Sequence, residues 1–112
     1  MTTDQAGALI EPRDMLLITA GGEISDYKPA SGKKYTLEEL RFAVDGYIEL
    51  VHLWNNLKGK RFEMVVNEEG KLPHKNLKVN VLATRLAHLY GGGRYDRDVI
   101  VGSALVVGPG RL

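Results

Sequence analysis

The chain has 112 residues, no cysteine and a formal net charge of +1. This length fits one domain whose hydrophobic core is large enough to fold without stabilising cross-links. The lack of cysteine excludes disulfides, thiolate metal sites and thiol nucleophiles. Scattered basic residues with almost no net charge disfavour duplex binding through a long-range basic field, and no apolar stretch reaches the roughly 18 residues of a membrane span.

The N-terminal part of the chain predicts an arm followed by a hairpin. Residues 1–14 have little hydrophobic pattern and contain Pro12, so we expect a flexible arm. This polar start lacks the charged-then-apolar order of a signal peptide, which favours an intracellular protein. The short runs Met15–Thr19 and Ile24–Lys28 are separated by the pair Gly21-Gly22. Because glycine accepts positive φ, this arrangement favours a tight β-hairpin.

A short helix is predicted next, because Thr36-Leu37-Glu38-Glu39 has the form of a capping box. In a capping box the threonine hydroxyl accepts from the backbone N–H of Glu39, and the Glu39 carboxylate accepts from that of Thr36. Apolar residues then recur at helical spacing, at Leu37, Leu40 and Val44. Gly46 suits a helix C-cap, which gives about two and a half turns.

Two strands and a turn follow. Tyr47–Trp54 has apolar residues on both faces, which is typical of an interior strand. Arg61–Asn67 alternates apolar and charged residues, which predicts a half-exposed strand. Asn67-Glu68-Glu69-Gly70 is a strong turn signal, because asparagine starts turns through its side chain and Gly70 can adopt the left-handed conformation.

The last third of the chain predicts a second helix and a buried strand. Asn80 is the expected N-cap, and the buried face is formed by Leu82, Leu86, Leu89 and Tyr90. Gly91–Gly93 ends this helix. Asp98–Val107 is almost wholly apolar and rich in β-branched residues, so we expect a strand covered on both faces at the centre of the core.

The predicted order ββαββαβ indicates a single α+β domain over residues 15–108, with a twisted, mainly antiparallel sheet of about five strands. We expect both helices on one face of the sheet, so that the other face meets solvent or a ligand. Gly108-Pro109-Gly110 breaks the last strand, and residues 109–112 are expected to form a tail.

Four segments together resemble a family of small uncharacterised domains that is frequent in bacteriophages, prophages and plasmids. These segments are Asp45–Val51, Val65–Pro73, Asn80–Thr84 and Ile100–Val106. The resemblance covers roughly residues 15 to 107 and carries over no catalytic residue. It implies a small accessory protein of a mobile element, in the cytoplasm of the host cell.

The loop after the second helix is a candidate ligand site. Phosphate loops precede helices, where free N–H groups face the anion; Gly91–Gly93 follows a helix, so ending that helix is its expected role. Arginine binds phosphate in a bidentate fork, so the loop could still close over an anion. Tyrosines in connectors are expected to be exposed and to stack on a ligand. The candidate residues for a small anionic or nucleotide-like metabolite are therefore Tyr35, Arg94, Tyr95 and Arg97.

The turn at Asn67, Glu68 and Glu69 is a second candidate. Neighbouring carboxylates in an exposed turn do not supply the converging pair that acid–base catalysis requires. We expect a solvated hairpin tip, and the alternative is a protein-recognition loop.

We predict no enzyme, metal site or cofactor. His52, His74 and His88 lack the paired spacing of metal ligands. The chain also lacks a cysteine nucleophile, a glycine-rich strand-to-helix loop and a nucleophile elbow.

The sequence therefore favours a non-catalytic binding protein of a mobile element, whose ligand is a host protein or a small anionic metabolite. One alternative is a single-stranded nucleic-acid-binding module, if basic clusters meet on one sheet face beside an aromatic residue. These clusters are Lys33-Lys34, Lys58-Lys60-Arg61 and Lys71-Lys75-Lys78. Another alternative is a structural or assembly protein. The domain could also self-associate, through an edge left by the last strand or by the Gly21-Gly22 hairpin.

Overall fold

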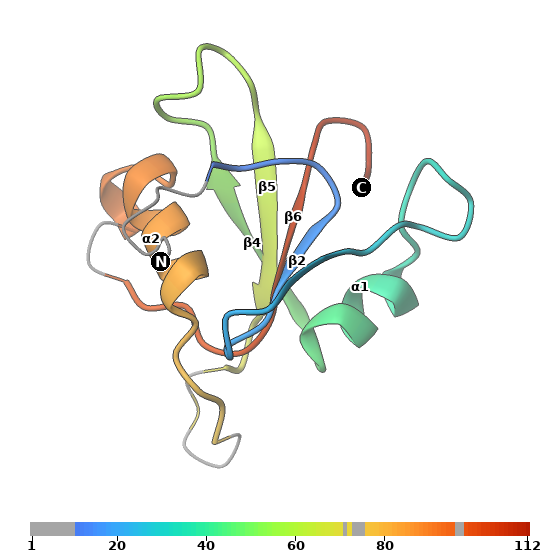
Figure 1. The fold of residues 1–112 in the computed structure, drawn as a ribbon, viewed down its shortest axis with the longest axis horizontal. Coiled ribbons are helices and arrows are strands. Elements are labelled where there is room, and N and C mark those ends of the chain that lie inside the picture. The colour runs from blue at the N-terminus through green and yellow to red at the C-terminus, as the bar shows by residue number, and fades with distance from the viewer. Residues whose placement is uncertain (1–10, 71, 73–75, 96–97) are drawn as a thin grey trace.

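The computed structural model describes residues 11–70, 72, 76–95 and 98–112, and for Arg94 only the backbone. The elements are β2 (Leu16–Ile18), β3 (Ile24–Asp26), α1 (Leu37–Val44), β4 (Ile48–Leu53), β5 (Phe62–Asn67), α2 (Val81–Tyr90), the short 3-10 helix η2 (Gly93–Tyr95) and β6 (Ala104–Val107). Every strand pair is antiparallel, in the order β3-β2-β6-β5-β4 (Figure 1). The α+β prediction, with its five-stranded sheet and the order ββαββαβ, is confirmed.

The C-terminal strand β6 lies at the centre of the sheet, as expected from its apolar sequence. It pairs with β2 on one side and with β5 on the other, and all four of its residues are buried. The strand is shorter than predicted, because Gly102 has a φ of +77° and its N–H donates to the Lys78 carbonyl. Since β6 has two neighbours, the prediction that the last strand leaves an open edge is wrong.

The two helices lie on opposite faces of the sheet, so the prediction that both cover one face is wrong (Figure 1). Met64 packs in the cluster under α2, whereas Val65 packs in the cluster under α1. Neighbouring residues of a strand point to opposite faces, and both of these are fully buried. A strand that is buried on both faces requires another element of the fold packed against each face. For the same reason the half-exposed character predicted for Arg61–Asn67 is wrong.

Side-chain caps fix where the helices begin and end. The Thr36–Glu39 capping box is present, and Asn80 caps α2 as predicted. The C-cap of α1 is Asp45, with a φ of +58°, one residue before the expected Gly46. Asn67 completes this end of α1, because its side-chain amide donates to the carbonyl oxygens of Val44 and Asp45 at 3.0 and 3.1 Å. No helix among the described residues is long and apolar enough to cross a membrane.

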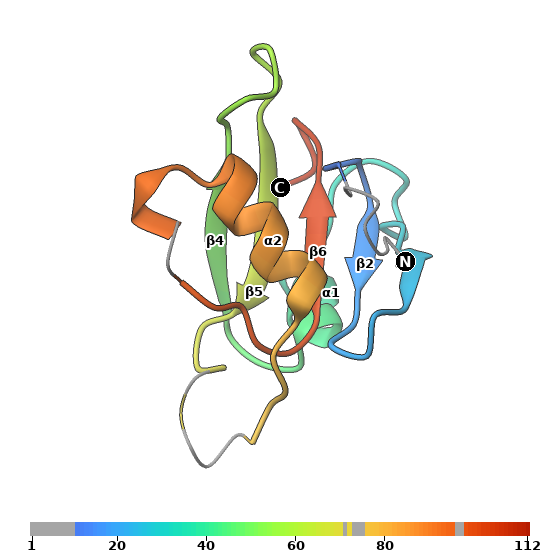
Figure 2. The same cartoon turned by 60° about the vertical axis from the view of Figure 1, so that its left-hand side comes forward.

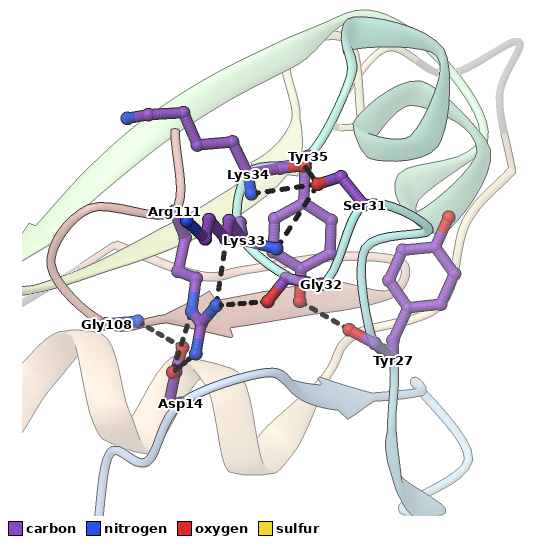
Figure 3. Close-up of polar contacts among 9 residues, drawn as sticks. All are labelled: Asp14, Tyr27, Ser31, Gly32, Lys33, Lys34, Tyr35, Gly108 and Arg111. Carbon is purple, nitrogen blue, oxygen red and sulfur yellow. Dashed lines mark hydrogen bonds and ion pairs between the residues drawn. The ribbon is translucent and has the colours of Figure 1, made fainter.

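Residues beyond β6 are tied to the start of β2 (Figure 3). The Arg111 guanidinium donates to Asp14 Oδ2 from Nε at 2.9 Å and to the carbonyl oxygens of Gly32 and Lys33 from Nη1. The second Asp14 oxygen accepts from the Gly108 N–H at 2.7 Å. The segment expected to be a tail therefore contacts Asp14, just before β2, and the loop before α1. Most of the predicted N-terminal arm lies outside the described residues.

The Asp14–Arg111 pair makes the free energy of unfolding depend on pH. Burial alone would raise the pKa of the Asp14 carboxyl, but hydrogen bonds from Arg111 and Gly108 and the charge of Arg111 outweigh it, so the pKa is lowered. The pair therefore stabilises the fold above the unfolded-state pKa of about 3.9, and this contribution is lost as pH falls through the lower folded value.

We expect Asp14→Asn to cost about 1–2 kcal/mol in free energy of unfolding at neutral pH. The variant should then lose less stability than the parent between about pH 4 and pH 2, where the Asp14 carboxylate is protonated. Urea unfolding at a series of pH values measures both effects. Parallel pH profiles for the two proteins would show that the pair does not contribute.

Candidate functional site

A cavity of about 210 Å³ opens where β4 begins and β5 ends. One wall is formed by the two strands, and the other by residues 98–101, which run across these strand ends before β6 (Figure 2). The residues that line it are Glu49, Val51, Val66, Asn67, Glu68, Tyr95, Asp98, Val99, Ile100 and Val101. Three of them carry carboxylates, and no lysine or arginine is among these described lining residues.

The carboxylates surround an apolar floor. The carboxylates of Glu49 and Glu68 are exposed and make no hydrogen bond or ion pair with the described residues. Asp98 accepts a hydrogen bond from the Val99 N–H at 3.0 Å. Val51 and Val66 lie buried beneath them. A pocket with acidic walls and an apolar base matches a cation on an apolar stem, which describes lysine and arginine side chains.

The walls of this pocket are held in place before any ligand binds. His88 Nε2 donates to the Asp98 carbonyl oxygen at 2.6 Å, and the Ile100 N–H donates to Thr84 Oγ1 at 2.9 Å. Both bonds attach the outer wall to α2. On the strand side, the Glu68 N–H donates to the Tyr47 carbonyl oxygen at 2.9 Å. A fixed pocket avoids part of the entropic cost of ordering a site on binding.

Size also distinguishes classes of ligand. Pockets for drug-sized molecules typically measure about 300–1,000 Å³, whereas this one measures about 210 Å³. The space is therefore suited to a single side chain or a small amine, and its carboxylates repel anions.

Comparison with known proteins places the chain in a family. Residues 14–111 match the family model described as a domain of unknown function, DUF3846. The chain belongs to the DUF3846 family. No curated protein and no solved structure matches it significantly.

Within this DUF3846 domain, the predicted metabolite site does not assemble as expected. Tyr35 and Tyr95 were expected to be exposed, but only 7% and 8% of their surfaces are accessible. Tyr35 belongs to the cluster under α1 and Tyr95 to the cluster under α2, so the sheet separates them. The side chain of Arg94, and Arg97 entirely, lie outside the described residues.

Tyr35 has a structural role instead (Figure 3). Its hydroxyl donates to the Tyr27 carbonyl oxygen, and the two rings stack with centroids 5.8 Å apart. Burial, together with the nearby Asp14 carboxylate, raises the pKa of Tyr35 to about 12. The hydroxyl therefore stays protonated at neutral pH and remains a donor.

The residues of the predicted recognition turn have different roles: Asn67 stabilises the fold, and Glu68 lines the pocket. Asn67 is buried, and its side-chain oxygen accepts from the Glu69 N–H at 2.8 Å while its amide caps α1. Glu68 alone of the three places a free carboxylate at the pocket. Glu49 and Asp98 were missed by the sequence analysis. Glu49 and His52 are the two polar residues of the mainly apolar strand β4, and a carboxylate in such a strand was the available signal.

The structure forms no cluster of metal-binding type in the part of the chain it describes. No group of three or more histidine, aspartate or glutamate side chains there could hold a metal ion. His52 pairs with Glu63, while His88 bonds to a backbone carbonyl. His74 lies outside the described residues.

Proposed function

We propose that this DUF3846 domain is a non-catalytic binding protein of a mobile element, and that it binds a host protein by accepting a lysine or arginine side chain in the acidic pocket. The observation that carries this proposal is the meeting of Glu49, Glu68 and Asp98 over the floor of Val51 and Val66. The mobile-element setting is supported by the four sequence segments that resemble phage and plasmid domains.

A protein ligand fits the pocket better than a free anionic metabolite does. Carboxylates oppose phosphate, and the arginine N–H groups of the Asp14 pair are already bonded to Asp14, Gly32 and Lys33. A cationic side chain can approach Glu49 and Glu68 without displacing an existing partner. Each such charge-assisted hydrogen bond is worth about 1.5–3 kcal/mol.

Neutralising the two free carboxylates of the pocket should weaken partner binding strongly. We expect Glu49→Gln/Glu68→Gln to weaken binding by about a hundredfold, because two charge-assisted bonds are lost. The measurement is capture from bacterial lysate by immobilised protein, followed by affinity measurement on the purified partner. Glu23→Gln/Glu38→Gln is the matched control, since both of these side chains are exposed away from the pocket.

Capture that is equal for the pocket variant and the control would count against the proposal, and so would a partner whose binding survives acetylation of its lysines and blocking of its arginines. Elution of the domain as a large oligomer, with no carboxylate-dependent partner, would favour an assembly role instead.

A further inference from the structure

The loop between β4 and β5 carries three cations within four positions of the chain. Lys58 and Lys60 are exposed and make no hydrogen bond or ion pair through their side chains. Arg61 follows directly and lies over the ring of Trp54, with its guanidinium carbon 4.7 Å from the ring centroid. Arg61 therefore contacts the aromatic ring directly, and the two lysines lie in the same loop.

Trp54 is exposed but held in position. Its accessible fraction is 42%, and its indole N–H donates to Glu63 Oε2 at 2.8 Å. The His52 ring lies 4.5 Å from the indole, centroid to centroid, and pairs with the same Glu63 carboxylate. This carboxylate is thus engaged by two partners, and the indole is fixed in one orientation.

The loop itself is anchored to the end of α2. The Asn55 N–H donates to the Tyr90 carbonyl oxygen at 3.0 Å, and the Asn56 amide donates to that of Leu89 at 3.1 Å. Asn56 and Lys58 both have positive φ values, 59° and 54°, which non-glycine residues rarely adopt without support from their surroundings. The lysines therefore project from a loop of defined shape.

A second cavity, of about 250 Å³, adjoins the loop on the side away from Trp54. Lys58, Lys60 and Phe62 line it, and Glu11 contributes one carboxylate. Phe62 belongs to the face covered by α2, whereas Glu63, which holds Trp54, points to the other face. The loop thus offers an aromatic ring on one side and a lysine-lined cavity on the other.

We propose that this end of the β4–β5 hairpin binds single-stranded nucleic acid, with a base stacked on Trp54 and the flanking phosphates held by Lys58, Lys60 and Arg61. The base takes the ring face that the Arg61 guanidinium covers in the free protein, and Arg61 turns to a phosphate. Stacking on an exposed ring requires an unpaired base, which a duplex does not present. The formal net charge of +1 also favours local contacts over long-range attraction to a duplex.

This surface is separate from the acidic pocket. Glu49 stands near the start of β4 and Trp54 directly follows its end, so about 17 Å of strand separates them at roughly 3.3 Å per residue. The carboxylates of one site therefore do not oppose phosphates at the other, and either proposal can fail without the other.

Trp54 is the only tryptophan in the chain, so its fluorescence reports on this site alone. We expect oligothymidylate of about ten nucleotides to quench the fluorescence saturably at low salt, since stacked bases quench indole emission. The logarithm of the binding constant should fall with the logarithm of salt concentration with a slope of about −2, at roughly 0.7 per phosphate contacted.

Separate variants test the contributions of the lysine charges and of the Trp54 ring to binding. Lys58→Ala/Lys60→Ala should reduce the magnitude of the salt slope by about 1.4, whereas Lys28→Ala/Lys78→Ala, a matched pair of exposed lysines elsewhere, should leave it unchanged. Trp54→Ala, followed by anisotropy of a labelled oligonucleotide, should bind roughly tenfold more weakly or worse. Circular dichroism checks that each variant folds.

The proposal is overturned by unchanged fluorescence at low salt, by an equal loss of binding in the control pair, or by duplex DNA binding as tightly as the single strand. Loss of quenching on adding salt, together with the variant pattern above, supports it.

Discussion

Replacing Asn80 by alanine is expected to lower the free energy of unfolding by about 3–5 kcal/mol. The side chain is only 1% exposed, and it makes three hydrogen bonds. Its amide donates to the Ile18 and Gly102 carbonyl oxygens, both at 2.9 Å, and its oxygen accepts from the Ala83 N–H at 3.0 Å. Loss of an N-cap costs about 0.5–2 kcal/mol, and each buried group left without a partner costs about 1–3.

Two further variants isolate the cause. Asn80→Asp keeps the cap acceptor but turns a carboxylate toward two carbonyl oxygens, so it should be at least as destabilised as the alanine variant. Thr36→Ala removes an exposed cap and should cost about 1 kcal/mol. Urea unfolding of the three proteins provides the comparison. An Asn80→Ala cost no greater than that of Thr36→Ala would show that the bonds to Ile18 and Gly102 contribute little.

The second large effect is expected from the two separate halves of the core. Leu86 belongs to α2 and packs against the sheet, and Leu105 lies on the other sheet face under α1; both are fully buried. Leu86→Ala and Leu105→Ala should each cost about 2–5 kcal/mol, through lost apolar burial and the cavity that remains. Equilibrium unfolding measures both values.

Because the sheet separates these two side chains, their effects should add. The milder variants Leu86→Val and Leu105→Val keep the double variant folded, and we expect their costs to sum within about 0.5 kcal/mol. A coupling energy of about 1 kcal/mol or more would contradict the packing of the helices on opposite faces, because residues in contact couple to that extent.

The sequence was most informative where a local pattern has a local cause. The capping box at Thr36, the cap at Asn80 and the central position of β6 all follow from residue types and spacing. The prediction that both helices cover one face of the sheet was wrong, although the sequence contained a signal against it. Val65 was interpreted as part of an alternating, half-exposed strand, yet an apolar residue on each face of β5 already required a second cover.

The side chains of the candidate site were harder to predict, because they meet only through tertiary structure. Tyr35 and Tyr95 lie in connectors, and connectors are usually exposed. Here each connector folds over a different sheet face and buries its tyrosine. Glu49 and Asp98 are far apart in the sequence and converge through the return of the chain after α2, which no local spacing encodes.

The acidic pocket is tested most directly by nuclear magnetic resonance on the 15N-labelled domain. Titration with a short peptide containing one arginine should give saturable shifts of the backbone amides of Glu49, Val66, Glu68, Val99 and Val101. The shifts should vanish in Glu49→Gln/Glu68→Gln and with a citrulline peptide, which keeps the shape and loses the charge. Equal shifts with the citrulline peptide, or shifts confined to other parts of the domain, would contradict the assignment of this pocket to a cationic side chain.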